Sequence, residues 1–251
     1  MSNQVAASGS GSSCPVCGGS GWELYAASVE GYGTPLEFAR PCSKCQAERY
    51  SRSRTGVPPQ FQDADLSKFK FNIYSRNMEK LEKLARNFFS RFREWESAGK
   101  GLYLWSRTPG SGKTFLSCCL GKSIMMRYNL RMRFVTVPNY LAAVTASYKR
   151  ESGTIDESQI YRDCALLVFD DMGTQKSGEW QDQEIFRIVN DRFNAGKVTL
   201  YTANMPPEDL NVNARLIDRI AKSSIVIQLP EESIRQKQAT AEQEDFLSRM
   251  L

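Results

Sequence analysis

The stretch of residues 101–114, GLYLWSRTPGSGKT, constrains the fold of this chain more than any other. Its apolar run at residues 102–105 is typical of a strand buried on both faces. Gly-Ser-Gly-Lys-Thr follows the run, and a helical pattern begins directly after it. A strand, a glycine-rich turn, Gly-Lys-Thr and a helix in that order predict a phosphate-binding loop.

This loop is expected to bind ATP through its backbone and two side chains. Glycines let backbone N–H groups turn toward phosphate oxygens, Lys113 brings a positive charge, and the Thr114 hydroxyl can hold Mg²⁺. The expected ATP-binding residues are Thr108, Pro109, Gly110, Ser111, Gly112, Lys113, Thr114 and Phe115. Arg107 stands where the usual pattern has its first glycine. A chance match in a surface loop is the alternative, and the flanking strand and helix disfavour it.

Length and composition narrow the class of protein. The 251 residues allow one large domain, or a medium domain with an appendage. A formal charge of +5 permits a nucleic-acid partner without demanding one. The absence of histidine excludes histidine-based acid–base chemistry and histidine-containing metal sites. No apolar run is long enough to cross a membrane and no secretory signal opens the chain, so we expect a cytoplasmic protein without a membrane partner.

Four of the seven cysteines predict a structural zinc site. Cys14, Cys17, Cys42 and Cys45 form two C-x-x-C pairs, and four thiolates make the tetrahedral shell that Zn²⁺ prefers. An iron–sulfur cluster and a redox pair are the alternatives. The basic residues around and after the second pair are compatible with either a solvated linker or a contact with DNA phosphates. The expected domains are a disordered segment (1–13), a zinc module (14–50), a linker and lead-in (51–74), a core (75–236) and a polar tail (237–251).

The core alternates strands and helices, which predicts an α/β sandwich around a parallel sheet. One apolar stripe predicts a long helix over residues 75–98. The expected strands are residues 102–105, 132–137, 165–169, 198–202 and 223–229. The expected helices are residues 114–128, 139–150, 156–163, 180–194 and 213–221. The tail is either a loose helix or a partner-binding peptide.

Polar side chains follow two of these strands where ligands bind in parallel sheets. Asp170 and Asp171 end the apolar run 165–169, and Asn204 ends the run 198–202. Downstream of a phosphate loop, Asp170 is expected to hold Mg²⁺ and Asp171 to orient or deprotonate the attacking water. Asn204 is placed to hydrogen-bond the γ-phosphate or that water. An acidic strand-to-loop turn without catalytic function is the alternative.

Four segments resemble an AAA+ ATPase of the DnaC/DnaI helicase-loader type, with an IstB-like core. They are the LLVFDDMG strand, TLYTANMPPEDL, NARLIDRI and the PPQF lead-in at residues 58–61. The resemblance implies an AAA+ αβα sandwich with a five-stranded parallel sheet and no C-terminal lid, preceded by a small zinc-ribbon domain. It implies that Asn204 is the sensor, that Arg219 is the arginine finger reaching a neighbouring subunit's ATP, and that Arg215 supports it. Arg235 resembles the arginine that closes the family's core.

By this resemblance the chain is an ATP-dependent loader of a replicative DNA helicase onto single-stranded DNA in bacteria or phage-infected bacteria. The zinc module would grip the helicase, and copies would assemble with ATP between subunits, so that oligomerisation and DNA stimulate ATP hydrolysis. The expected DNA contacts are Tyr140, Tyr148, Lys149 and Arg150. An IstB-type transposition ATPase that recruits a transposase is the alternative. A non-enzymatic adaptor is disfavoured by the intact set of Lys113, Asp170, Asp171 and Asn204.

Overall fold

The computed structural model describes residues 15–17, 22–27, 35–42, 55–148, 157–174 and 178–250. The chain divides into two compact units, residues 1–54 and residues 55–251. In the first unit, β1 (Trp22–Ala27) and β2 (Leu36–Pro41) form an antiparallel hairpin in which Trp22 lies opposite Pro41. Cys17 precedes one strand and Cys42 follows the other, so both flank the same end of the hairpin.

The second unit is built on the five-stranded parallel sheet that the sequence predicts, which confirms the α/β class. Its strands are β3 (Gly101–Trp105), β4 (Met132–Thr136), β5 (Leu166–Met172), β6 (Val198–Ala203) and β7 (Ser224–Gln228). Their order is β4-β5-β6-β3-β7, and every pairing is parallel. The carboxyl ends of all five strands therefore meet at one edge of the sheet.

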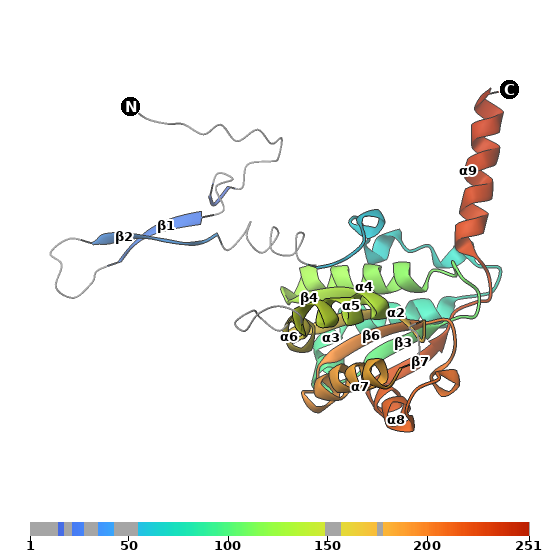
Figure 1. Ribbon diagram of the computed structural model, residues 1–251. Helices are drawn as coiled ribbons and strands as arrows, with labels where there is room; N and C mark the ends of the chain where they lie inside the picture. The colour runs from blue at the N-terminus through green and yellow to red at the C-terminus, as the bar shows by residue number, and fades with distance from the viewer. Residues whose placement is uncertain are drawn as a thin grey trace. The chain divides into compact units, whose positions relative to one another are not determined.

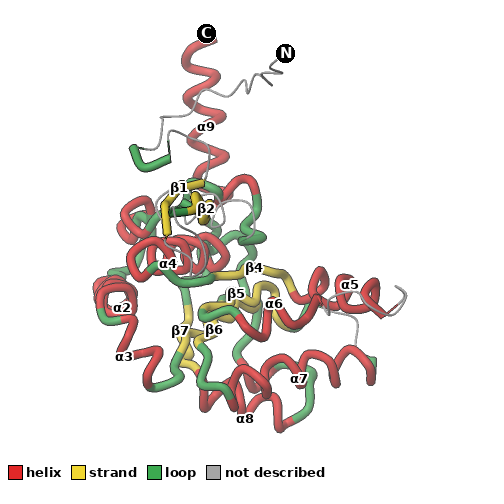
Figure 2. Tube along the Cα trace, turned by 90° about the vertical axis from the view of Figure 1, so that its left-hand side faces the viewer, coloured by secondary structure: helices red, strands yellow, loops and turns green. Residues whose placement is uncertain are grey.

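Helices cover both faces of this sheet, as Figures 1 and 2 show. One layer contains α2 (Glu79–Ser90), α3 (Phe92–Ser97) and α4 (Lys113–Tyr128). The opposite layer contains α5 (Val137–Tyr148), α6 (Glu157–Asp163), α7 (Glu179–Asn194) and α8 (Ala214–Ser223). Short 3₁₀ turns lie at η1 (Pro59–Phe61), η2 (Leu66–Lys68), η3 (Phe71–Ile73) and η4 (Pro207–Asp209).

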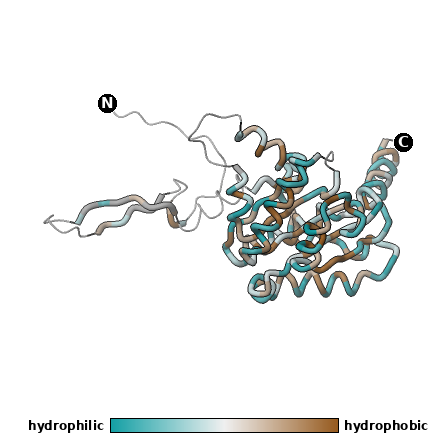
Figure 3. The backbone as a smooth tube through the Cα atoms, turned by 60° about the horizontal axis from the view of Figure 1, so that its bottom comes forward, coloured by the Kyte–Doolittle hydropathy of each residue, from teal (hydrophilic) through white to brown (hydrophobic). Residues whose placement is uncertain are grey.

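Alternation along the strands divides the interior into two cores. On β3, Leu102 and Leu104 join the core beneath α2 and α4, whereas Tyr103 joins the core beneath α5 and α7. On β5, Val168 and Phe169 divide in the same way. Successive strand residues point to opposite faces, so a strand buried on both faces must be apolar throughout. Figure 3 shows hydrophobic segments in the interior of this unit and a mixture of hydrophilic and hydrophobic residues along the helices around them.

Two expectations about the lead-in and the first helix are corrected. The predicted helix over residues 75–98 is two helices, because the chain leaves helical geometry at Arg91 (φ −114°, ψ 28°). The break brings the rings of Phe92 and Trp95 against Phe88, with centroids 5.8 and 5.0 Å away. The predicted linker also belongs to the core from residue 55 onward, since buried side chains such as Phe69 and Phe71 pack there.

The segment after β7 is a single helix, α9 (Ile234–Met250), which projects away from the rest of its unit (Figure 1). The expected tail therefore takes the helical alternative. Within the described residues, no helix is both long and apolar enough to span a membrane. The expected disorder of residues 1–13 lies outside the described part of the chain.

Candidate nucleotide-binding site

The phosphate loop joins β3 to α4 and takes a conformation that only its glycines allow easily. Gly110 and Gly112 have φ angles of +78° and +93°, in the left-handed region that other residues rarely adopt. A Cβ atom on Gly112 would also lie 2.9 Å from the hydroxyl of Tyr74. The loop can thus turn its backbone toward a ligand at the start of α4, where the helix dipole favours an anion.

Lys113 is held inside this loop. Its side chain is buried, and its Nζ donates to the carbonyl oxygens of Ser106 and Thr108 at 3.0 and 3.2 Å and to Ser111 Oγ at 3.3 Å. Burial lowers the pKa of this amine, and the carboxylates of Asp171, Glu231 and Asp170 oppose the shift. The loop therefore holds the ammonium group in position to bind a ligand that carries more negative charge than these carbonyl and hydroxyl oxygens.

Asp170 links the phosphate loop to the strand that carries the acidic pair. Its Oδ1 accepts hydrogen bonds from Thr114 Oγ1 at 2.9 Å and from Thr202 Oγ1 at 2.6 Å. Burial raises the pKa of Asp170 to about 6, the Thr202 hydroxyl opposes this, and the neighbouring Asp171 adds to it. A cation at this carboxylate would reverse that shift, because it favours the charged form.

Asp171 is placed by a strained turn of the backbone. Its φ angle is +60°, and the pairing of β5 with β6 shifts register between Phe169 and Met172. The backbone N–H of Asp171 donates to Thr202 Oγ1 at 3.0 Å. The turn presents the Asp171 side chain to the cavity beside the loop, whereas Asp170 stays buried. Strain of this kind persists where the surrounding structure fixes it, which is common at functional sites.

A cavity of about 410 Å³ lies over the loop, large enough for part of a nucleotide. Its lining joins the loop to Asp171, to the end of β6 and to the start of α9. The rings of Phe61 and Phe115 lie 5.6 Å apart and form one wall of it. The lining residues are Gln60, Phe61, Pro109, Gly110, Ser111, Gly112, Lys113, Thr114, Phe115, Asp171, Asn204, Ile234, Arg235 and Gln238.

The shape of the loop also depends on several residues outside the sequence motifs. The Glu231 carboxylate accepts the backbone N–H groups of Arg107 at 3.0 Å and Thr108 at 2.7 Å, and the Thr108 hydroxyl at 2.9 Å. Burial alone would raise the pKa of Glu231, but these hydrogen bonds outweigh it and lower the pKa to about 2. The Arg107 side chain, at the unusual position of the motif, pairs with Asp209 at 2.9 Å.

The chain segments before and after the core both reach the loop. Tyr74 donates its hydroxyl to the carbonyl oxygen of Ser111 at 2.7 Å. From the other side, the backbone N–H of Ile234 donates to the carbonyl oxygen of Gly110 at 2.9 Å. The Glu232 carboxylate accepts from the backbone N–H and the hydroxyl of Ser75, which ties the two segments together. No local motif could have indicated these contacts, because their partners are far apart in sequence.

The two arginines assigned to a finger lie away from the chain's own cavity. Arg215 is exposed on α8. The Arg219 guanidinium donates to Asn190 Oδ1 at 3.1 Å, pairs with Asp218 at 3.0 Å, and stacks 4.8 Å above the Phe193 ring. The finger role of Arg219 and Arg215 therefore stays a prediction.

One predicted DNA contact is wrong. Tyr140 is fully buried in the core, where its hydroxyl donates to Glu184 Oε1 at 2.8 Å and its ring packs 5.6 Å from Phe169. Tyr148 is 62% exposed and forms an edge-to-face pair with Trp180, with ring centroids 6.4 Å apart. Lys149 and Arg150 lie outside the described residues.

Only two of the four predicted zinc ligands lie among the described residues. Cys14 and Cys45 lie outside it, whereas Cys17 is half-buried and Cys42 is buried. Among the described residues, no group of three or more cysteine or carboxylate side chains is close enough to hold a metal. The expected Zn²⁺ site therefore stays a prediction.

Comparison with known proteins places the second unit in a family. A sequence profile described as "IstB-like ATP binding protein" matches residues 62–242. The chain belongs to this family. The match confirms the coarser prediction of an IstB-like ATP-binding core, and with it the expectation of ATP as ligand.

Curated relatives of the chain include chromosomal replication initiator proteins DnaA. The protein from Desulfotalea psychrophila is 26% identical over 145 residues, 57% of this chain and 30% of that protein. The protein from Borreliella afzelii is 30% identical over 115 residues, 45% of this chain and 24% of that protein. The chain thus spans less than a third of the length of these relatives.

Solved structures agree in fold. The structure titled DnaC helicase loader has a TM-score of 0.61 at 22% identity, covering 69% of this chain and all of that one. A putative primosome component from Streptococcus pyogenes has a TM-score of 0.60 at 20% identity, covering 75% of this chain and 97% of that one. At these identities the likeness establishes the fold alone.

Proposed function

We propose that this protein is an ATPase that loads a replicative helicase onto single-stranded DNA. The observation that carries the ATPase part is the 2.9 Å hydrogen bond between Thr114 Oγ1 and Asp170 Oδ1. It joins two segments 56 residues apart in sequence at the point where a nucleotide-bound Mg²⁺ needs oxygen ligands. The IstB-like family match and the DnaC-like fold support the choice of reaction and process.

The residues around this bond suit ATP hydrolysis. Thr114 and Asp170 would hold Mg²⁺, which when bound neutralises charge on the phosphates. Loop N–H groups and Lys113 would bind the phosphates. The Asp171 carboxylate, turned into the cavity, would orient the attacking water or accept its proton, and Asn204 would hydrogen-bond that water or the γ-phosphate.

Assembly would complete the site. We assign Arg219 as the finger that contacts ATP bound to a neighbouring copy, with Arg215 in support, because neither lies at the chain's own cavity. A guanidinium supplied by a neighbour accelerates phosphoryl transfer by about 10³–10⁵-fold in related chemistry. Hydrolysis would then be slow in the monomer and fast in the assembled, DNA-bound state.

The first unit would contact the helicase as a zinc module. The hairpin supports this assignment, because Trp22 pairs with Pro41 and so brings the chain ends that carry Cys17 and Cys42 to the same side. Cys14 and Cys45 would complete a four-sulfur shell there. Bound Zn²⁺ supplies folding free energy to such small units and takes no part in catalysis.

Bases of single-stranded DNA would stack on the edge-to-face pair of Tyr148 and Trp180. Both rings are exposed, at 62% and 38%, and exposed aromatic rings are the surfaces on which unpaired bases stack. This pair replaces the buried Tyr140 as the candidate stacking surface. Lys149 and Arg150 follow Tyr148 directly in sequence and would meet the phosphates.

A loading assay tests the proposal: a replicative hexameric helicase is mixed with circular single-stranded DNA, ATP and this protein, and unwinding is measured. We expect unwinding to require this protein and residues 1–54, and Lys113→Ala to abolish both ATP binding and loading. Tight ATP binding by Lys113→Ala would refute the site. The family match also suits an IstB-type transposition ATPase, and ATP-dependent recruitment of a transposase without helicase loading would select that function.

A further inference from the structure

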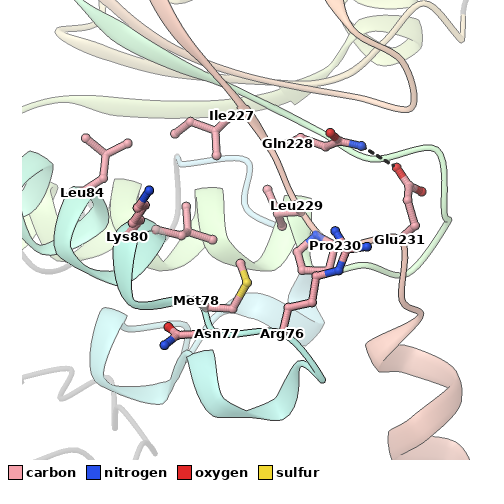
Figure 4. A pocket seen from close by; sticks show the side chains of 11 residues that line it. Arg76, Asn77, Met78, Lys80, Leu84, Ile227, Gln228, Leu229, Pro230 and Glu231 are labelled. Atoms are coloured by element: carbon pink, nitrogen blue, oxygen red, sulfur yellow. Dashed lines mark hydrogen bonds between the residues drawn. The ribbon is translucent and has the colours of Figure 1, made fainter.

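A groove that shares no lining residue with the nucleotide cavity runs between β7 and the start of α2. Figure 4 shows it from close by, with Met78 and Leu84 on one side and Ile227 and Leu229 on the other. Its volume is about 330 Å³. The groove is lined by Arg76, Asn77, Met78, Lys80, Leu81, Leu84, Ile227, Gln228, Leu229, Pro230 and Glu231.

The strand beside this groove is an unprotected edge. Among the described strands, β7 pairs only with β3 and ends the sheet. Ile225 and Val226 are 42% and 44% exposed, and Ile225 extends the apolar lining of the groove because it faces the same side as Ile227. Exposed apolar edges of this kind are normally covered by another segment or chain.

Two unpaired cations stand at the rim of the groove. Arg76 and Lys80 are both exposed, and neither has an ion pair with any residue in the described ranges. The nearby Lys83, by contrast, is paired with Glu79 on the same helix. An apolar groove with two unpaired cations favours an occupant that carries apolar side chains and carboxylates.

The C-terminal half of α9 has these properties. Phe246, Leu247 and Met250 are 53%, 55% and 68% exposed, and their spacing places them on one stripe of the helix. Glu242 and Glu244 lie on either side of that stripe, both exposed and both without an ion pair among the described residues. The helix projects from its unit and carries this stripe into open space (Figure 1).

We propose that α9 of one copy of this chain lies in the groove between α2 and β7 of a second copy. A chain cannot fill its own groove this way, because α9 starts beside Glu231 at the groove and runs outward. Its 17 helical residues place the apolar stripe roughly 15–25 Å from that start. Helix and groove are different surfaces, so the contact repeats head to tail and builds a ring or a filament. The inference does not depend on the nucleotide.

Charge reversal at one surface, followed by rescue with the opposite reversal, tests this contact, and sedimentation velocity measures the association. The parent protein carries Lys113→Ala and is studied without nucleotide, so that ATP-linked assembly is absent. We expect the parent to self-associate. Arg76→Glu with Lys80→Glu, or Glu242→Lys with Glu244→Lys, should weaken association at least about tenfold. The two reversed proteins mixed together should associate within about threefold of the parent. The control is Lys83→Glu with Arg86→Glu, two paired cations of α2 outside the groove, which should change association less than about twofold.

The proposed contact would be refuted if the parent were monomeric, if the mixture did not regain association, or if the control lost as much association as the test variants.

A second measurement tests where the two copies touch. Leu84→Cys protein mixed with Phe246→Cys protein should form, under mild oxidation, a dimer whose disulfide joins residues 84 and 246, identified by mass spectrometry of the linked peptides. This link can arise only between copies, since each chain holds one of the two new thiols, and the peptide masses distinguish it from disulfides of the seven native cysteines. Absence of that dimer in a mixture that still associates would also refute this binding geometry.

Discussion

Replacing Glu231 tests whether a side chain outside the sequence motif keeps the phosphate loop in its binding conformation. The Glu231→Ala variant loses the carboxylate that accepts the N–H groups of Arg107 and Thr108 and the Thr108 hydroxyl. Hydrogen bonds to a charged group contribute about 1.5–3 kcal/mol each, but Glu231 is exposed and water can replace it in part. We therefore expect a total loss of about 1–2 kcal/mol.

This loss should appear in ATP affinity, because a loop that populates other conformations binds in proportion to its competent fraction. A loss of 1–2 kcal/mol corresponds to roughly a 5–30-fold higher Kd. Titration calorimetry with ATP and Mg²⁺ at pH 7.5 measures it. The pKa of Glu231 is lowered to about 2 from 4.5, so its stabilising effect is complete above about pH 4.5 and is lost as the pH falls toward 2.

The matched control is Glu94→Ala, which removes an exposed carboxylate that pairs with Arg91 on the same helical segment and has no contact with the loop. We expect its Kd for ATP to stay within about twofold of the parent. If both variants weakened ATP binding equally, or if neither did, the role assigned to Glu231 would be wrong.

Three other predictions address the remaining parts of the molecule. Thr202→Val removes the hydroxyl that donates to Asp170 and accepts from the Asp171 N–H. It should lower the free energy of unfolding, measured with urea, by roughly 2–4 kcal/mol, whereas Thr202→Ser should lower it by under about 1 kcal/mol. Equal losses in the two variants would contradict the role assigned to this hydroxyl. Arg219→Ala should bind ATP normally but lose the turnover that assembly and DNA stimulate, and unchanged stimulated turnover would exclude it as the finger. Purified protein should contain one zinc per chain by atomic absorption, and chelation should unfold residues 1–54 while ATP binding persists; protein without zinc ends the metal proposal.

The sheet and the nucleotide site were predictable because their signals are local. The apolar runs at residues 102–105 and 165–169 are typical of strands buried on both faces, and each is followed at once by the polar groups of the site. Parallel pairing then brings the ends of β3, β5 and β6 to one edge without further information. Thr114 and Asp170 meet for this reason, although β6 separates their strands.

The errors arose where tertiary packing chooses between equivalent local patterns. Tyr140 and Tyr148 lie two turns apart on one helix, but only Tyr140 joins the core beneath α5 and α7, while Tyr148, the last residue of α5, is exposed. The break at Arg91 is similarly invisible in an unbroken apolar stripe. Glu231 carries no signal at all, since its partners are 123 and 124 residues away and no spacing rule connects them.

The phosphate loop is held from both ends of its own unit, by Tyr74 on one side and by Ile234 on the other, with Ser75 and Glu232 clasping the two together. Displacing either flanking segment would therefore break a hydrogen bond to the carbonyl oxygen of Ser111 or of Gly110, so the shape of the loop depends on both ends of its unit.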